Sequence, residues 1–178
     1  ALDGQYTGSV SLPAGMTSGT DGENNGTVLL GDNSVGLYGK NDSRLSNKGV
    51  ITAGSASAGL MTSGTNSSAI NSGTVSIGAN SQGLAVKDGT DIKNLSSGVI
   101  TSVAAGAAGM FADNNSAAMM NVINDGIIDL DGDKSIGIYS KGTTNQSINN
   151  NLGGLIKVGD STNISDPSIG IYSAIPGS

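Results

Sequence analysis

The sequence that decides the fold is Ser34-Val35-Gly36-Leu37-Tyr38, followed by Asn47-Lys48-Gly49-Val50-Ile51-Thr52-Ala53. The first stretch places a glycine between two apolar residues. The second follows a glycine with apolar residues at alternate positions. Both patterns recur in alternation along the chain, and recurrence of this kind is typical of solenoids, in which each repeat stacks on the next.

The first pattern, apolar–Gly–apolar, occurs seven times. The residue after the glycine is apolar in every copy, and the residue before it is apolar in all but one, where Gln82 stands. The copies are Ala14-Gly15-Met16, Val35-Gly36-Leu37, Ala58-Gly59-Leu60, Gln82-Gly83-Leu84, Ala108-Gly109-Met110, Ile136-Gly137-Ile138 and Ile169-Gly170-Ile171.

The second pattern also occurs seven times and places a β-branched residue two positions after its glycine. The position four after the glycine is apolar in all copies except the one with Ser102. The copies are Gly8-Val10-Leu12, Gly26-Val28-Leu30, Gly49-Ile51-Ala53, Gly73-Val75-Ile77, Gly98-Ile100-Ser102, Gly126-Ile128-Leu130 and Gly154-Ile156-Val158.

Each pattern has period two, which predicts strands. Because asparagine and glycine tolerate left-handed backbone conformations, we expect the chain to turn a corner at the asparagines before the second pattern, Asn24, Asn47, Asn71 and Asn124. A weaker apolar group before these corners predicts a short third strand in each repeat: Leu45, Ile70, Leu95 and Ile123.

The spacing of the first-pattern glycines grows from 21 residues (Gly15 to Gly36) to 33 residues (Gly137 to Gly170). The arc from each second-pattern glycine to the next first-pattern glycine is nearly constant in length. The arc from each first-pattern glycine to the next second-pattern glycine lengthens toward the C-terminus. This predicts an all-β fold, a three-sided parallel β-solenoid of about seven coils. We expect residues 1–178 to form one such segment of a longer rod, with repeats from about 8 to 172.

Composition and charge narrow the function classes. The chain has 29 glycines, no histidine, no cysteine, 3% aromatic and 12% charged residues, with a formal net charge of −6. Disorder is the alternative reading, but the regular apolar pattern argues against it. The few cations are scattered, which argues against a nucleic-acid partner, and no apolar stretch is long enough to insert into a membrane.

No catalytic constellation is evident, so we expect no enzyme activity and no cofactor. Without histidine, the Ser-His-Asp and Cys-His nucleophile systems are impossible. Asp129, Asp131 and Asp133 resemble the start of a calcium loop, but Lys134 and Ser140 occupy positions where such a loop needs glycine and glutamate. We therefore interpret this stretch as a corner and keep calcium only as a weak alternative.

Two ladders of like residues are expected beside the first pattern. Two positions after its glycine lie Thr17, Tyr38, Met61, Ala85, Phe111, Tyr139 and Tyr172. These residues should face outward, where aromatics either stack on one another or grip a glycan or protein loop. Two positions before the glycine, we expect a structural hydroxyl ladder of Ser34, Ser57, Ser81, Ser135 and Ser168.

The motifs Val35-Gly36-Leu37-Tyr38, Asn47-Lys48-Gly49-Val50-Ile51 and Ile136-Gly137-Ile138-Tyr139 resemble the passenger repeats of Gram-negative autotransporter (type V secretion) adhesins. The resemblance covers residues 8–172, and two-partner secreted haemagglutinins look similar. It implies a right-handed β-helix displayed on the cell surface through an outer-membrane barrel absent from this chain. It also implies attachment to host cells or other bacteria, with binding in loops or along one face.

The resulting hypothesis is an adhesin segment that binds a host glycan or protein receptor. A structural stalk that presents a distant domain is the rival, and a polysaccharide-active enzyme is a third reading. We expect binding in the loops within 143–151 and 159–168 and in the neighbouring aromatics. The candidate residues are Tyr38, Phe111, Tyr139, Tyr172, Asn145, Asp160 and Asp166.

Overall fold

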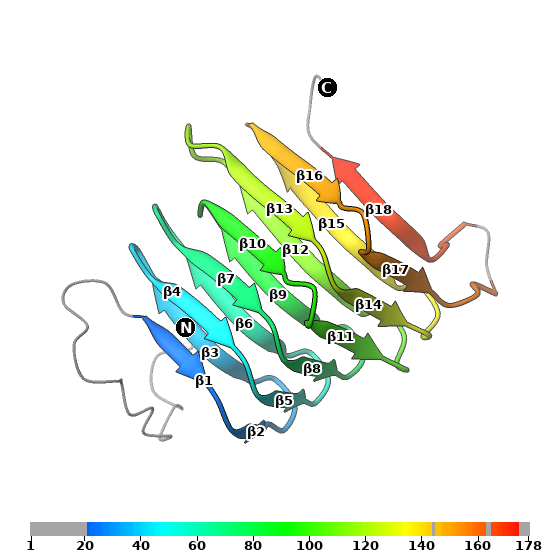
Figure 1. The fold of residues 1–178 in the computed structure, drawn as a ribbon. Helices are drawn as coiled ribbons and strands as arrows, with labels where there is room; N and C mark the ends of the chain where they lie inside the picture. The colour runs from blue at the N-terminus through cyan, green and yellow to red at the C-terminus, as the bar shows by residue number, and fades with distance from the viewer. Residues whose placement is uncertain (1–20, 144, 163–164, 175–178) are drawn as a thin grey trace.

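The computed structural model describes residues 21–143, 145–162 and 165–174. Within them the chain winds through eighteen strands that form three parallel sheets of six strands each (Figure 1). Each coil contributes one strand to each sheet, so these residues form six stacked coils. The seventh predicted coil, with Val10 and Met16, lies outside the described residues. The all-β parallel solenoid is therefore confirmed.

Sheet A holds the short third strand that the sequence predicts in each repeat. Its strands are β1 (Gly22–Asn24), β4 (Arg44–Asn47), β7 (Ser68–Asn71), β10 (Asp91–Asn94), β13 (Met120–Asn124) and β16 (Gln146–Asn150). Of the four apolar residues predicted for this strand, Leu45 is buried and points inward. Ile70 and Ile123 are half-buried and pair with Lys93, so they lie one position away from the residues that face the core. Leu95 lies just after the end of β10. The inward ladder is instead Leu45, Ala69, Ile92, Val122 and Ile148.

Sheet B contains the second pattern. Its strands are β2 (Thr27–Leu29), β5 (Val50–Ala53), β8 (Thr74–Ile77), β11 (Val99–Ser102), β14 (Ile127–Leu130) and β17 (Leu155–Val158). The β-branched position forms one continuous inward ladder as predicted: Val28, Ile51, Val75, Ile100, Ile128 and Ile156.

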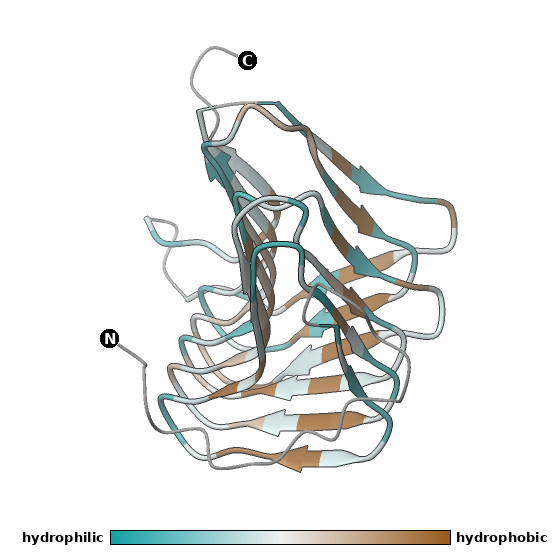
Figure 2. Ribbon diagram, turned by 90° about the vertical axis from the view of Figure 1, so that its left-hand side faces the viewer, coloured by the Kyte–Doolittle hydropathy of each residue, from teal (hydrophilic) through white to brown (hydrophobic). Residues whose placement is uncertain are grey.

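Sheet C contains the first pattern. Its strands are β3 (Val35–Lys40), β6 (Ala58–Ser63), β9 (Gln82–Lys87), β12 (Ala108–Asn114), β15 (Ile136–Gly142) and β18 (Ile169–Ala174). The predicted inward ladder is present here too, as Leu37, Leu60, Leu84, Met110, Ile138 and Ile171. Figure 2 shows the apolar positions at similar places in successive coils.

The core is one side chain deep on each side, and its burial follows position along the rod. Leu60, Val75 and Ile100 in the middle coils are fully buried, whereas Ile171 in the last described coil is 45% exposed. Each coil buries its ladder residues against the coils above and below, which is how a solenoid forms a core without large aromatic side chains. The described residues contain no helix that could span a bilayer.

The first pattern does not keep strict period two, because the strand kinks at its glycine. The ladder registers Ala58 with Gln82 and Leu60 with Leu84 but skips the glycines between them. An added Cβ at Gly59 would lie 2.5 Å from Val75 Cγ1 and 2.6 Å from the carbonyl oxygen of Gly83. Only glycine fits where backbones approach this closely. The residue before the glycine therefore faces out, while the residue after it faces the core.

The corner between sheets A and B contains an asparagine ladder inside the rod, which corrects our sequence interpretation. The predicted corner asparagines do not adopt left-handed backbone conformations. They end the strands of sheet A, and each side-chain amide donates to the carboxamide oxygen of the next coil at 2.8–2.9 Å. The ladder is Asn24, Asn47, Asn71, Asn94, Asn124 and Asn150.

The corner between sheets B and C contains the left-handed turn residues and the serine ladder. Asn33, Ala56, Asn80, Gly106 and Lys134 have positive φ and stack through backbone hydrogen bonds from each coil to the next. The Ser34 and Ser57 amides donate to the hydroxyl of the next coil, both at 3.0 Å, and Ser135 N donates to Ser168 Oγ at 3.3 Å. The predicted hydroxyl ladder is confirmed, with an interruption at Ala107.

Candidate functional site: the outer face of sheet C

The outer face of sheet C presents three columns of side chains that run along the rod. The first, which we call the edge column, borders the corner with sheet B and consists of Val35, Ala58, Gln82, Ala108, Ile136 and Ile169. The second, the aromatic column, consists of Tyr38, Met61, Ala85, Phe111, Tyr139 and Tyr172. The third, the lysine column, consists of Lys40, Ser63, Lys87, Asp113, Lys141 and Ala174.

Three of the four predicted aromatic site residues form one stack. The ring centroids of Phe111 and Tyr139 are 5.3 Å apart, as are those of Tyr139 and Tyr172. The interplanar angles of 55° and 34° give tilted pairs, the geometry that aromatic quadrupoles favour over a flat sandwich. The predicted stacking of the aromatics is therefore confirmed. Contact with a glycan or protein loop stays a prediction, because stacked rings that are only partly buried can still contact a ligand.

Tyr38 lies apart from the stack, because Met61 and Ala85 separate it from Phe111 along the column. Tyr38 is 52% exposed, and the ammonium of Lys40 lies 5.8 Å from the centroid of its ring. Lys141 lies 5.4 Å from the Phe111 centroid in the same way. The lysine column therefore supplies cations beside the aromatic rings, a contribution that the sequence reading did not identify.

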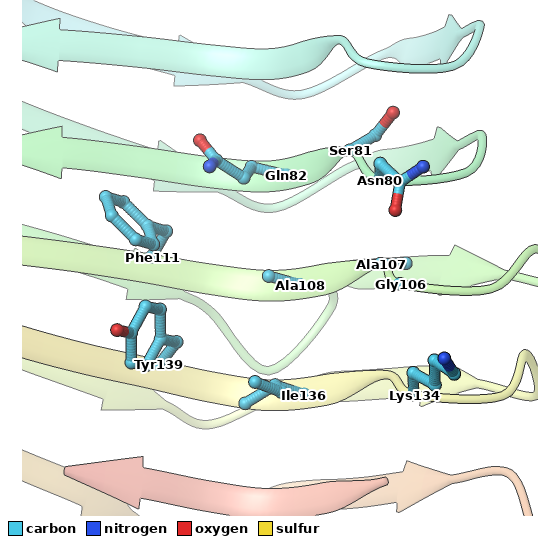
Figure 3. A pocket seen from close by; sticks show the side chains of 10 residues that line it. All are labelled: Asn80, Ser81, Gln82, Gly106, Ala107, Ala108, Phe111, Lys134, Ile136 and Tyr139. Atoms are coloured by element: carbon cyan, nitrogen blue, oxygen red, sulfur yellow. The ribbon is translucent and has the colours of Figure 1, made fainter. Parts of the chain in front are cut away.

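Two shallow hollows lie between the aromatic column and the corner with sheet B. The first lies over Ala58, with Met61 on one side and Asn33 and Asn80 on the other. The second lies over Ala108, with Phe111 and Tyr139 on one side and Asn80 and Lys134 on the other (Figure 3). Gln82 lines both hollows, so they form one interrupted groove along the rod.

The sequence reading missed the hollows, although one signal for them was present. Gln82 is the single polar residue at the first position of the apolar–Gly–apolar pattern. A polar residue is accepted there because this position faces solvent, and its neighbours Ala58 and Ala108 are small enough to leave space above them. The kink at the glycine, which turns this position outward, cannot be read from a period-two pattern.

The loop candidates lie elsewhere, and one of them is not a loop. Residues 146–150 form strand β16, so only residues around Asn145 belong to a corner. The Asn145 carbonyl accepts hydrogen bonds from Met120 N and Asn114 Nδ2, which gives it a structural role. The expectation that 143–151 is a loop is therefore wrong, because a sixth strand of sheet A occupies most of it. A binding role for Asn145 stays a prediction.

The second predicted loop, 159–168, is a true connection between β17 and β18 as far as the described residues show. Asp160 is exposed in it, and Asp166 forms an ion pair of 2.7 Å with Lys134 of the preceding coil. This ion pair raises the pKa of Lys134, mainly through the hydrogen bond from Lys134 to Asp166. The loop is thus attached to the edge of the second hollow through a residue that lines it.

The aspartates of the weak calcium candidate are engaged with other side chains. Lys157 Nζ lies 2.6 Å from Asp131 Oδ1 and 3.0 Å from Asp129 Oδ1, and these hydrogen bonds raise the pKa of Lys157. Asp133 accepts a hydrogen bond from Thr162 at 3.1 Å. Among the residues that the structure describes, no group of three or more acidic, histidine or cysteine side chains is placed to hold a metal ion.

No protein-family model, curated protein or solved structure matches this chain. The columns and hollows of sheet C and the sequence resemblance are the observations that bear on function.

Proposed function

We propose that this chain is a segment of an autotransporter adhesin passenger and attaches the cell to a receptor through the outer face of sheet C. The receptor is a glycan or protein on a host cell or on another bacterium. In this proposal the rod is displayed at the cell surface and anchored through an outer-membrane barrel. The proposal assigns the chain binding rather than catalysis.

The observation that supports binding is the concentration of aromatics on one outer face. Phe111, Tyr139 and Tyr172 stack there without contributing to the core ladders, and Tyr172 is 41% exposed. The described part of the chain otherwise places a single aromatic, Tyr38, in the same column. Exposed aromatic surface beside hydrogen-bonding groups is typical of recognition sites, because a ring contributes contact area at a low entropic cost.

The chemistry of the hollows also suits binding better than catalysis. Lys134 is the one charged side chain that lines them, and it is already paired with Asp166. General acid–base catalysis needs titratable groups placed within reach of a substrate proton. The groove instead combines carboxamides and aromatic rings with small and aliphatic side chains, and these groups orient a ligand without transferring protons.

The stalk remains the second candidate, and the unbroken asparagine ladder supports it. Hydrogen bonds connect all six coils through this corner. Together with three continuous sheets, they produce a rod whose coils cannot slip relative to one another. A stalk needs this property, but it does not need a column of exposed aromatics.

A binding screen on the immobilised chain separates the two functions. The wild type should bind at least one glycan on an array or one protein from host-cell membranes. The double variant Phe111→Ala/Tyr139→Ala should lose at least tenfold in affinity with an unchanged far-UV circular dichroism spectrum. Ile127→Ala is the matched control, since this exposed apolar residue lies on sheet B. Silence of the wild type in the whole screen would favour the stalk.

A further inference from the structure

The two hollows repeat with the period of the rod. The first lies over Ala58 and the second over Ala108, and both residues pair with Gln82 of the coil between them. The hollows are therefore two coils apart, which is roughly 10 Å at the spacing of hydrogen-bonded strands. A ligand that fills both must present similar groups at this interval along a straight line.

The size of each hollow limits what can enter it. Their volumes are about 170 Å³ and 210 Å³, below the ~300–1,000 Å³ of pockets that enclose a small molecule. Each hollow thus accommodates one ring-sized unit of a ligand, most of which stays in solvent. Such contacts are weak singly, and affinity arises when one chain occupies several of them.

The polar groups around the hollows suit hydroxyl or acetamido groups without net charge. Asn80 and Gln82 line both hollows, so each hollow has carboxamides on its rim. A carboxamide offers both donors and an acceptor, as needed to pair with ligand groups that do both. Lys134 does not add a free positive charge, since Asp166 neutralises it at 2.7 Å. Lys141, beside the Phe111 ring, is likewise paired, with Asp113 at 3.4 Å, so the groove favours a neutral ligand over an anionic one.

One side of the groove is apolar and suits the flat face of a sugar ring. Met61 forms this side at the first hollow, and Phe111 and Tyr139 form it at the second (Figure 3). The alanines beneath add no polar group. A peptide strand would instead seek unpaired backbone groups, but β6, β9, β12 and β15 are each paired on both sides.

We propose that the groove on sheet C binds a neutral, linear, β-linked polysaccharide that lies along the rod axis. Alternate sugar residues occupy the hollows over Ala58 and Ala108, because an extended β-linked chain repeats every two residues, at about twice the ~4.8 Å strand spacing. Gln82 hydrogen-bonds the intervening residue. This inference specifies the receptor class within the proposed function and depends on it.

The test uses calorimetry with defined oligosaccharides. Cellohexaose, chitohexaose and β-1,4-mannohexaose are the neutral extended probes, maltohexaose is the curved neutral probe, and polygalacturonate is the acidic one. At least one extended hexamer should bind, and at least tenfold more tightly than its disaccharide, because only the hexamer spans both hollows. Maltohexaose and polygalacturonate should bind at least tenfold more weakly.

Filling the hollows tests the placement. Ala108→Leu and Ala58→Leu each add bulk above a hollow and should reduce hexamer binding to the level of the disaccharide. Ala118→Leu is the matched control, because Ala118 is an exposed alanine in a corner away from the groove. Melting curves of all three variants confirm folding. Equal hexamer affinity in Ala108→Leu and wild type would overturn the inference.

The remaining outcomes separate this inference from the proposed function. Binding of polygalacturonate alone, or of a host-cell protein alone, overturns the neutral-chain inference and leaves receptor attachment standing. Binding of no probe by the wild type, together with silence in the receptor screen, overturns both and identifies the segment as a stalk.

Discussion

Two corners of the coil solve the same problem with different side chains. At the corner between sheets A and B, six asparagines form an unbroken ladder in which each amide donates to the next carboxamide. At the corner between sheets B and C, serine hydroxyls accept from backbone amides, and the ladder is interrupted at Ala107. At the first corner, asparagine side chains hydrogen-bond to one another and to backbone carbonyls. At the second corner, serine side chains hydrogen-bond to the backbone alone.

The difference affects how much each corner tolerates a lost residue. The Asn71 amide donates to Asn94 Oδ1, Gly73 O and Val99 O, and its oxygen accepts from Asn47. The Ser81 hydroxyl accepts from Ser57 N and donates to the carbonyl of Gly54 or Ala79. A buried group that loses its partner costs more than the bond itself, so the asparagine ladder should be the more sensitive corner.

Asn71→Ala should have the largest effect. Asn71 is fully buried, and its removal interrupts the ladder and takes away the donor of the buried Asn94 Oδ1 and one acceptor of Asn47 Nδ2, at a cost of about 3 kcal/mol in the free energy of unfolding. Urea unfolding followed by circular dichroism measures the loss. Asn150→Ala is the matched control. Asn150 is exposed, so its loss should cost clearly less. Equal losses at the two positions would contradict the ladder as a source of stability.

Ser81→Ala should have a smaller effect, about 1–1.5 kcal/mol of destabilisation, because one hydroxyl with a few hydrogen bonds is lost. The same urea titration measures it against Asn71→Ala. If Ser81→Ala lowered the free energy of unfolding as much as Asn71→Ala, the two corners would contribute equally to stability.

Ala107→Ser should be stabilising and should complete the serine ladder. Ala107 lies one coil after Ser81 in this corner, where the other coils place a serine, and Ser81 Oγ itself accepts from Ser57 N of the coil before it. A new hydroxyl there can accept from the coil before it, for a gain of about 1 kcal/mol. Thermal unfolding measures the gain. A lower melting temperature would show that Ala107 is required for packing.

Lys48→Gln should change the free energy of unfolding least, because Lys48 lies on the outside of the asparagine corner. The hydrogen bond from Lys48, 2.8 Å away, lowers the pKa of Glu23 below its usual 4.5. The substitution should raise this pKa, which an NMR titration of Glu23 detects. Because a lowered carboxyl pKa stabilises the fold above that pKa and not below it, the stability gap between wild type and variant should close as the pH falls through the pKa of Glu23. A gap independent of pH would exclude this ion pair as its cause.

The sequence could predict the ladders because they depend on like residues at like positions. The inward residues of sheets B and C, the aromatic column and the hydroxyl ladder follow directly from the two glycine patterns. Sheet A was harder, because its strand has only one or two inward apolar positions. Ala69 is too small and Ile92 too isolated to be read as a pattern, whereas the outward Ile70 and Ile123 stand out in the sequence.

The asparagine ladder and the groove could not be predicted for a different reason. Asparagine and glycine close together are a turn signal, so Asn47 and Asn71, each two positions before a glycine, predict corners with left-handed backbones. Their side chains instead satisfy one another, which depends on contacts about 23 to 30 residues apart in sequence. The groove depends on a kink at Gly59, Gly83 and Gly109, and the space above Ala58 and Ala108 exists only once the coils are stacked.

The close approach at these glycines has a consequence for how such a rod can change in length. Gly36, Gly59, Gly83, Gly109 and Gly137 each lack room for a Cβ because the next coil's glycine carbonyl lies 2.5–2.6 Å from where it would be. The requirement for glycine at this position is therefore set by the next coil, and it is the same in each of these five coils. Duplication of a whole coil preserves it and lengthens the rod by ~4.8 Å. A one-residue insertion within the strand disrupts the glycine contacts with the coils on both sides, whereas corners such as 159–168 can accommodate extra residues. Length and corner loops are thus the properties that this architecture leaves free to vary.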